Sequence, residues 1–241
     1  MPFTFSHPAI ILPFAKYSGK YISLTGLIIG SVTPDFEYFF RMKVQSNISH
    51  TISGLFYFDL PVGILLSFVF HMLIRNSLYN NLPKVFKSRL EVFKSFKWNN
   101  YFKTHYFVVI FSLLIGAASH LFWDSFTHLH GYAIQNISSL QSSFNIAGYE
   151  IAIYKLLQHL SSLVGGLFIA LAFFRLPKTD LAKQGISIDY WLTILTIITV
   201  IVALSLIFSV EKNLIGQFVV TGITAVFIAL VFAPFFNRNK I

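Results

Sequence analysis

Long apolar runs are the feature that most constrains this chain of 241 residues. Six such runs lie at about 21–40, 52–74, 106–126, 151–174, 190–209 and 214–236. A helix needs about 20 mostly apolar residues to cross a bilayer, and only hydrogen-bonded helices or closed barrels satisfy the backbone there. Charged residues make up only 11% of the chain, against about a quarter in a soluble domain. We therefore predict an all-α, polytopic transmembrane helix bundle of about six spans in the cell membrane.

The chain is predicted to form a single integral membrane domain over residues 1–241, without repeats or low-complexity linkers. Its motifs fall within residues 1–175, and residues 176–241 form two plain C-terminal spans. The N-terminus lacks an early positive region and a small-residue cleavage site, so no cleavable signal peptide is expected. Residues 8–15 are apolar but too short to cross a membrane, which leaves a re-entrant or interfacial helix as the alternatives there.

The distribution of Lys and Arg predicts the orientation of the spans. The loop 75–105 carries seven of these residues, whereas the loop 127–149 carries none. Because cytoplasmic loops are enriched in Lys and Arg, we expect 75–105 inside and 127–149 outside; Arg41 and Lys43 in an outer turn are a minor exception. The net charge of +9 thus reflects membrane topology and does not indicate nucleic-acid binding. Residues 84–104 form either an interfacial basic helix or a solvated loop.

With this orientation, ionisable residues from four spans collect near the outer face. They are Asp35, Glu37, His50, Asp59, His120, Asp124, His128, His130, Glu150 and His159. An Asp costs about 2.5–3.5 kcal/mol at the centre of a membrane helix, so such residues usually pair, face the bundle interior or bind an ion. The chain has no cysteine, and carboxylates combined with imidazoles suit zinc, manganese or iron. His71 and His105 are expected at the opposite, cytoplasmic interface.

The segment SHLFWDSFTH, residues 119–128, places a histidine, an aspartate and a histidine four residues apart. Residues four apart share a helix face, so His120 and Asp124 can grip one ion. His128 lies about 12 Å from His120 along a straight helix. Either the helix ends and lets His128 fold back, or Asp124 bridges two ions. Polar contacts between helices are the alternative to a metal, and Asp59 could instead satisfy backbone groups freed at Pro61.

Four short motifs together carry a resemblance to known families. They are SHP at 6–8, PDFE at 34–37, SHT at 49–51 and SHLFWDSFTH at 119–128. In the order of these motifs the chain resembles a bacterial family of uncharacterised integral membrane proteins, classified as a domain of unknown function. It is more distantly similar to membrane-bound metal-dependent hydrolases and to the zinc-dependent phospholipase C and nuclease superfamily. The resemblance implies metal ligands at His7, Asp35, His50, His120, Asp124 and His128.

The match covers residues 1–130 and departs from the superfamily at one further motif. A His-x-x-x-Glu helix is expected there, but His159 is followed four residues later by Leu163, which argues against a full trinuclear site. His7 also requires explanation, because an N-terminus on the cytoplasmic side reaches an outer site only if residues 8–15 dip into the membrane. Pro8 suits the first position of a helix, so a helix is expected to begin there.

These observations lead to one functional expectation and two alternatives. We expect a metal-dependent hydrolase, with one or two divalent ions, preferably zinc, that acts on a phosphoester such as a lipid head group at the extracytoplasmic face. Glu37 or Asp59 would act as general base or would orient a ligand imidazole. Membrane lipid is the expected partner, and nucleic acid is not. The alternatives are a transporter, in which the acids form a relay, and a noncatalytic membrane scaffold.

Overall fold

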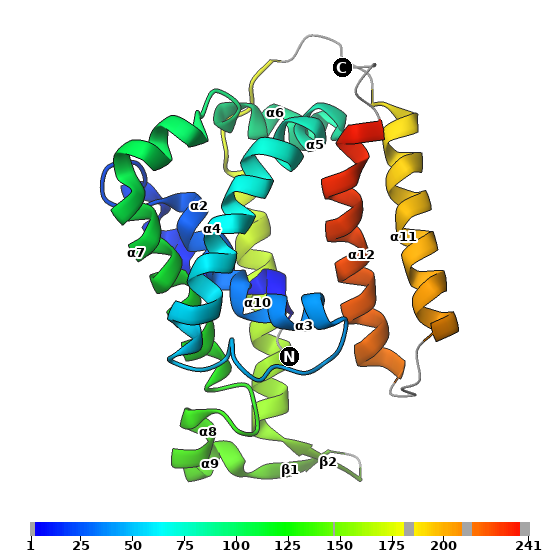
Figure 1. The fold of residues 1–241 in the computed structure, drawn as a ribbon. Coiled ribbons are helices and arrows are strands. Elements are labelled where there is room, and N and C mark those ends of the chain that lie inside the picture. Colours follow the sequence, from blue (N-terminus) through cyan, green and yellow to red (C-terminus); the bar gives the residue numbers. More distant parts are fainter. Residues whose placement is uncertain (1–2, 147, 181–185, 209–213, 237–241) are drawn as a thin grey trace. The chain divides into compact units, whose positions relative to one another are not determined.

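A computed structural model describes residues 3–146, 148–180, 186–208 and 214–236 of the chain (Figure 1). The fold is all-α apart from one two-stranded hairpin, as the sequence predicted. The long helical elements are α4 (Leu60–Val69), α7 (Trp98–Asp124), α10 (Ile153–Phe174), α11 (Ile188–Phe208) and α12 (Leu214–Phe236). The short α-helices are α1 (Pro8–Ile11), α2 (Leu24–Val32), α3 (Phe36–Arg41), α5 (Arg75–Asn81), α6 (Lys84–Leu90), α8 (Tyr132–Asn136) and α9 (Ser138–Gln141).

The remaining elements are short 3-10 and π-helical turns and the hairpin. The 3-10 turns are η1 (Thr4–Ser6), η2 (Leu12–Tyr17), η3 (Thr33–Asp35) and η6 (Glu91–Phe93). The π-helical turns are η4 (Leu55–Asp59) and η5 (Phe70–Ile74), which flank α4. Strands β1 (Ser143–Ile146) and β2 (Tyr149–Ala152) pair antiparallel, with Ser143 opposite Ala152.

Five helices of the described residues are long and apolar enough to cross a membrane. They are Leu55–Asn81, which combines η4, α4, η5 and α5, then α7, α10, α11 and Ile215–Phe236 of α12. Each coincides with one of the apolar runs found in the sequence, and each reaches the roughly 20 residues that a span requires. The chain is therefore a multi-pass membrane protein.

The apolar run at 21–40 differs from the other five. The structure divides it into α2, η3 and α3, with the 3-10 turn centred on Pro34. Proline has no N–H to donate and its ring disturbs the preceding turn, so the α-helix gives way there. The helix predicted within residues 8–15 is likewise divided, into α1 and the 3-10 turn η2, and Pro8 occupies the first position of α1 as expected.

The chain forms two compact units, each built from three separated segments. Unit 1 contains Met1–Asp35, Ile48–Ile64 and Tyr101–Arg175; unit 2 contains Phe36–Asn47, Leu65–Asn100 and Leu176–Ile241. All motifs that suggested a metal site, apart from Glu37, fall within unit 1. The two C-terminal helices α11 and α12 belong to unit 2, together with chain segments that precede residue 101.

In unit 2, α11 and α12 lie side by side (Figure 1). Tyr190 and Ile194 of α11 pack against Ala229 and Ala233 of α12, and all four side chains are buried. Small alanines let two helices approach closely where lipid supplies no hydrophobic driving force. The last two spans, which carry no polar motif in the sequence, therefore contribute to unit 2 by packing against each other.

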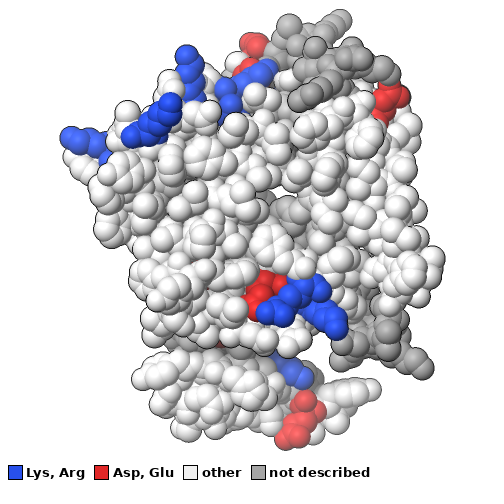
Figure 2. Space-filling model, viewed as in Figure 1, with Lys and Arg blue, Asp and Glu red and all other residues white. Residues whose placement is uncertain are grey.

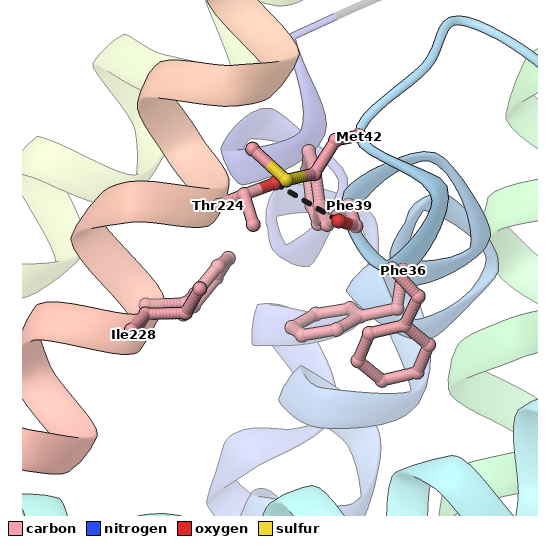
Figure 3. Close-up of a pocket in the computed structure, with 7 residues that line it drawn as sticks. Phe36, Phe39, Met42, Thr224 and Ile228 are labelled. Atoms are coloured by element: carbon pink, nitrogen blue, oxygen red, sulfur yellow. Dashed lines mark hydrogen bonds between the residues drawn. The ribbon is translucent and has the colours of Figure 1, made fainter. Parts of the chain in front are cut away.

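Unit 2 also contains a half-open apolar pocket of about 220 Å³ between α3 and α12 (Figure 3). Its lining residues are Phe36, Phe39, Phe40, Met42, Thr224, Phe227 and Ile228. The Thr224 hydroxyl donates to the carbonyl oxygen of Phe39 over 3.0 Å and also bonds within its own helix. The hydroxyl of Thr224 at this pocket is therefore hydrogen-bonded, and the rest of the lining is apolar, with four phenylalanine rings.

Candidate metal centre

The centre is built where α2 and α7 of unit 1 pack closely together. A Cβ atom at Gly30 would collide with the Leu113 carbonyl, and one at Gly116 would collide with the Leu27 carbonyl. Glycine at both positions lets the two backbones touch. As a result, the carbonyl oxygen of Ser31 lies 2.8 Å from Nδ1 of His120.

Six residues converge at this point, and they are the six that the motifs suggested: His7, Asp35, His50, His120, Asp124 and His128. We call them the His/Asp cluster. They come from the end of η1, the end of η3, the loop before η4, the end of α7 and the turn that follows α7. His7, Asp35 and His120 are almost completely buried. Residues that are far apart in the sequence thus lie close together within unit 1.

Asp124 lies at the middle of the His/Asp cluster. Its Oδ2 is 3.3 Å from Nε2 of His120 and 3.5 Å from Nε2 of His50. Its Oδ1 is 3.5 Å from Nε2 of His7 and 3.5 Å from Nδ1 of His128. One carboxylate therefore faces two pairs of imidazoles, one pair on each oxygen.

His128 lies beside Asp124, in the turn that follows α7. The backbone N–H groups of Thr127 and His128 both donate to the Asp124 carbonyl oxygen over 3.1 Å, so a hydrogen-bonded turn continues past Asp124. Residues four apart on such a turn face the same side. His128 therefore meets Oδ1 of Asp124, whereas His120 meets Oδ2.

Asp35 adds the second carboxylate. Its Oδ1 is 3.5 Å from Nε2 of His50 and 3.6 Å from Nε2 of His120, while its Oδ2 accepts a hydrogen bond from the hydroxyl of Thr4. Ligand atoms of His7, Asp35 and His120 lie within 4.8 Å of one another, as do those of His50, His120 and Asp124. Two overlapping groups of possible metal ligands therefore share His120.

Several of these polar atoms are buried without a hydrogen-bond partner among the described residues. They include both ring nitrogens of His7, Nε2 of His120, Oδ1 of Asp124 and Nε2 of His128. Buried polar groups are hydrogen-bonded in the large majority of cases, so these atoms require an explanation. The separations of 3.3–3.6 Å exceed a normal hydrogen bond. They match the roughly 3.4 Å between neighbouring ligand atoms of a tetrahedral ion with bonds of about 2.1 Å.

Three supporting residues around the cluster were not identified from the sequence. Ser31 accepts from Nδ1–H of His120, which leaves the Nε2 lone pair directed toward the carboxylates. The Ser49 hydroxyl lies 3.0 Å from Nδ1 of His50, and Thr4 holds Asp35. Such partners fix the tautomer and orientation of a metal ligand. Ser49 is adjacent to its histidine in the SHT motif, which was the one available signal; Thr4 and Ser31 are identified only by the fold.

The electrostatic environment differs between the histidines of the cluster. For His50, burial alone would lower the pKa, but the Asp124 and Asp35 carboxylates outweigh it and raise the pKa to about 9. For His7, burial and then the neighbouring His120 lower the pKa to about 3, despite the two carboxylates. Near neutral pH His50 therefore carries the proton that balances the carboxylates, whereas His7 is neutral.

The cluster is sealed on one side and accessible on the other. The side chains of His7 and His120 are at most 1% exposed, whereas those of His50 and His128 are 22% and 30% exposed. The ring of His7 stacks on that of His120 at 3.7 Å and lies 5.4 Å from Trp123, which closes the inner side. Water can thus reach the cluster from the side of His50 and His128.

Glu37 and Asp59, the two predicted catalytic carboxylates, are both buried but differ from the cluster in their surroundings. Oε1 of Glu37 accepts from the Arg41 guanidinium and the Asn47 N–H, and Oε2 accepts from the Ser46 hydroxyl. Asp59 ends the π-helical turn η4, two residues before Pro61. Neither carboxylate belongs to the two ligand groups found among the described residues.

The other histidines lie away from the cluster in their contacts. His71 stacks on Trp98 at 4.7 Å and lies 3.2 Å from the Arg75 guanidinium. His105 stacks on Tyr101 at 4.7 Å. His130 and His159 are exposed, in keeping with a loop position for His130.

Comparison with known proteins gives a family and no further relative. No curated protein and no solved structure matches the chain significantly. One family model, described as a domain of unknown function (DUF4184), matches residues 1–235. This range contains the whole His/Asp cluster and all five spanning helices except the last residue of the fifth. The chain is therefore a member of the DUF4184 family.

Proposed function

We propose that this protein is a membrane-embedded metalloenzyme that hydrolyses a phosphoester, such as the head group of a lipid. The observation that carries the proposal is the spacing of the ligand atoms in the His/Asp cluster. Four imidazole–carboxylate separations between 3.3 and 3.6 Å are too long for good hydrogen bonds and fit the edges of a metal coordination shell. A purely structural cluster would be expected to close into hydrogen bonds instead.

The donor set favours zinc and accommodates one or two ions. The residues that would hold an ion are His50, His120 and Asp124, or His7, Asp35 and His120, since the ligand atoms of each group lie within 4.8 Å of one another. His128, 3.5 Å from Asp124, would join the donor set if a second ion is held. Imidazole nitrogen and carboxylate oxygen donors are typical of zinc.

A bound metal would lower the pKa of a coordinated water to about 7 and polarise a phosphoryl oxygen. Hydrolysis then consumes one water, whose oxygen ends on phosphorus and one of whose protons ends on the released alcohol. The residues of the chain position the ligands: Ser31 and Ser49 orient their histidines, and Thr4 orients Asp35. The proposal assigns no step to Glu37, whose oxygens accept hydrogen bonds from Arg41, Asn47 and Ser46.

The accessible side of the cluster is proposed to open toward the extracytoplasmic face. The loop that follows His128 lacks Lys and Arg, whereas the segment that precedes α7 is rich in both, and positive loops remain in the cytoplasm. In this otherwise cysteine-free chain, Ser138→Cys and Ser95→Cys place one exposed thiol on each side. An impermeant maleimide should label only Ser138→Cys in intact cells, and labelling of Ser95→Cys alone would reverse the assignment.

The proposed reaction is tested with zinc-loaded protein in detergent against a panel of phospholipids and lipid-linked phosphates. Release of phosphate or of a phosphorylated head group is expected for the wild type and is expected to vanish in Asp124→Asn, which keeps the size of the side chain but removes its charge. His130→Ala is the matched control, since His130 is exposed in the same turn region.

Two results would count against the enzyme. Hydrolysis that survives in Asp124→Asn would point to a contaminant or another site. Stoichiometric metal without hydrolysis of any substrate on the panel would favour the alternatives considered from the sequence, in which the His/Asp cluster serves a transporter or a noncatalytic scaffold.

A further inference from the structure

A separate feature of unit 2 is the basic segment that joins the span ending at Asn81 to the start of α7. From Arg75 to Lys97 the chain carries six Lys and Arg residues and a single acid, Glu91. Figure 2 shows positive side chains gathered over α6. We call residues 84–97 the basic cap. The sequence left this region as either an interfacial helix or a solvated loop, and the structure provides features that distinguish the two.

The basic cap exposes apolar side chains beside its positive charges. On α6 and η6, Val85, Phe86 and Val92 are 54%, 42% and 49% exposed. Lys84 and Lys97 are exposed and Lys94 is half-buried on the same segment. A solvated loop is expected to expose polar residues, whereas a helix that lies in a membrane interface combines Phe or other apolar residues with Lys and Arg.

Buried cations lie beneath this surface. Arg75, Lys87 and Arg89 are at most 7% exposed, and their side chains donate to the carbonyl oxygens of Phe96, Asn80 and Val85 at 2.7–3.0 Å. Arg75 forms no ion pair with a carboxylate among the described residues. Backbone carbonyl oxygens thus accept from all three buried cations, and the exposed Lys84 and Lys97 supply charge at the surface of the basic cap.

We propose that the basic cap binds the head groups of anionic phospholipids at the membrane interface. Both of its ends continue directly into spanning helices, at Asn81 and at Trp98, so the segment is tethered at the bilayer surface. Clusters of four to eight Lys and Arg next to a span attract anionic lipids, at about 1 kcal/mol per residue. The exposed valines and Phe86 provide the apolar contact that a lipid surface accepts and a nucleic acid does not. This site is independent of the proposed hydrolase.

The test uses the full chain in a neutral detergent, titrated with phosphatidylglycerol and, separately, with phosphatidylcholine. Native mass spectrometry counts the lipids bound, and the thermal unfolding midpoint is followed in parallel. Wild type should bind phosphatidylglycerol in preference to phosphatidylcholine, and added salt should weaken this preference. The variant Lys84→Gln/Lys94→Gln/Lys97→Gln should lose on the order of 100-fold in affinity for phosphatidylglycerol, which corresponds to three charges.

The matched control is Lys16→Gln/Lys20→Gln/Lys155→Gln, which removes three exposed charges from unit 1. It should retain most of the affinity for phosphatidylglycerol. Equal binding of the two lipids by the wild type, or equal losses in the two triple variants, would overturn the proposal. Binding of polyglutamate by the basic cap without discrimination between the lipids would assign it to an acidic protein partner instead.

Discussion

Asp35 and Glu37 are two residues apart and each is 2% exposed, yet they belong to different units and have opposite surroundings. Glu37 in unit 2 accepts hydrogen bonds from Arg41, Ser46 and Asn47. Asp35 in unit 1 accepts from Thr4 and faces His50 and His120 at 3.5–3.6 Å. The oxygens of one buried carboxylate accept hydrogen bonds from three residues, whereas the other carboxylate accepts one hydrogen bond and faces two imidazole rings.

The difference shows that burial alone does not identify a functional carboxylate. A buried carboxylate is costly unless it is paired and hydrogen-bonded, and Glu37 meets that requirement with an arginine and two further donors. Asp35 accepts one hydrogen bond, from Thr4, and otherwise faces imidazole nitrogens, one of which, Nε2 of His120, is buried without a hydrogen-bond partner among the described residues. Glu37 therefore has the surroundings of a residue that stabilises the turn after α3, whereas Asp35 has those that the proposed metal site would require.

The largest effect is expected from exchanging each carboxylate for its amide. Asp35→Asn should bind metal at least about tenfold more weakly, because it loses a charged ligand. Glu37→Gln should keep the wild-type metal content, since Glu37 belongs to neither ligand group found among the described residues. Elemental analysis of both purified variants decides the matter. Equal metal loss in the two variants would remove the distinction between the two carboxylates.

The hydroxyl groups that hold these two carboxylates give the second comparison. Thr4→Val keeps the shape of the side chain but removes the donor to Asp35, and partners of this kind typically contribute 10–100-fold in metal affinity. Ser46→Ala removes the corresponding donor to Glu37 and should leave metal affinity unchanged. Competition with a chromophoric chelator measures both. A Thr4→Val protein with wild-type affinity would exclude the supporting role assigned to Thr4.

The last prediction concerns pH. His50, with a pKa raised to about 9, must lose a proton before it can bind a metal, whereas His7, with a pKa lowered to about 3, is already neutral. Raising the pH from 7 to 9 removes the competing proton, so zinc affinity should rise about tenfold per pH unit and level off above 9. A chelator competition series over this range measures the slope. A flat profile would mean that His50 is not a ligand or is not protonated in the free protein.

The spans could be predicted from the sequence because each depends on local information. A run of about 20 apolar residues has few alternatives to a membrane helix, and α7, α10, α11 and α12 lie where those runs lie. The run at 21–40 did not form a single regular helix, since Pro34 introduces the turn η3. The basic cap is a second example of what the sequence could not show. Its Lys and Arg residues were evident from the sequence, but the exposure of Val85 and Phe86 was known only from the structure.

By itself, the sequence determined the all-α membrane class and the six residues of the His/Asp cluster. Spans and short motifs can be recognised from residues that are adjacent in the sequence. Tertiary structure alone decided how those residues meet. The close packing of α2 on α7 at Gly30 and Gly116 brings Ser31 to His120, and the fold brings His7, Asp35 and His50 to Asp124 and His120. Asp35 and Glu37 illustrate the two sources of information. The donors to Glu37 are Arg41, Ser46 and Asn47, all within ten residues of it, whereas the donor to Asp35 is Thr4, which lies 31 residues away and reaches it only in the folded chain.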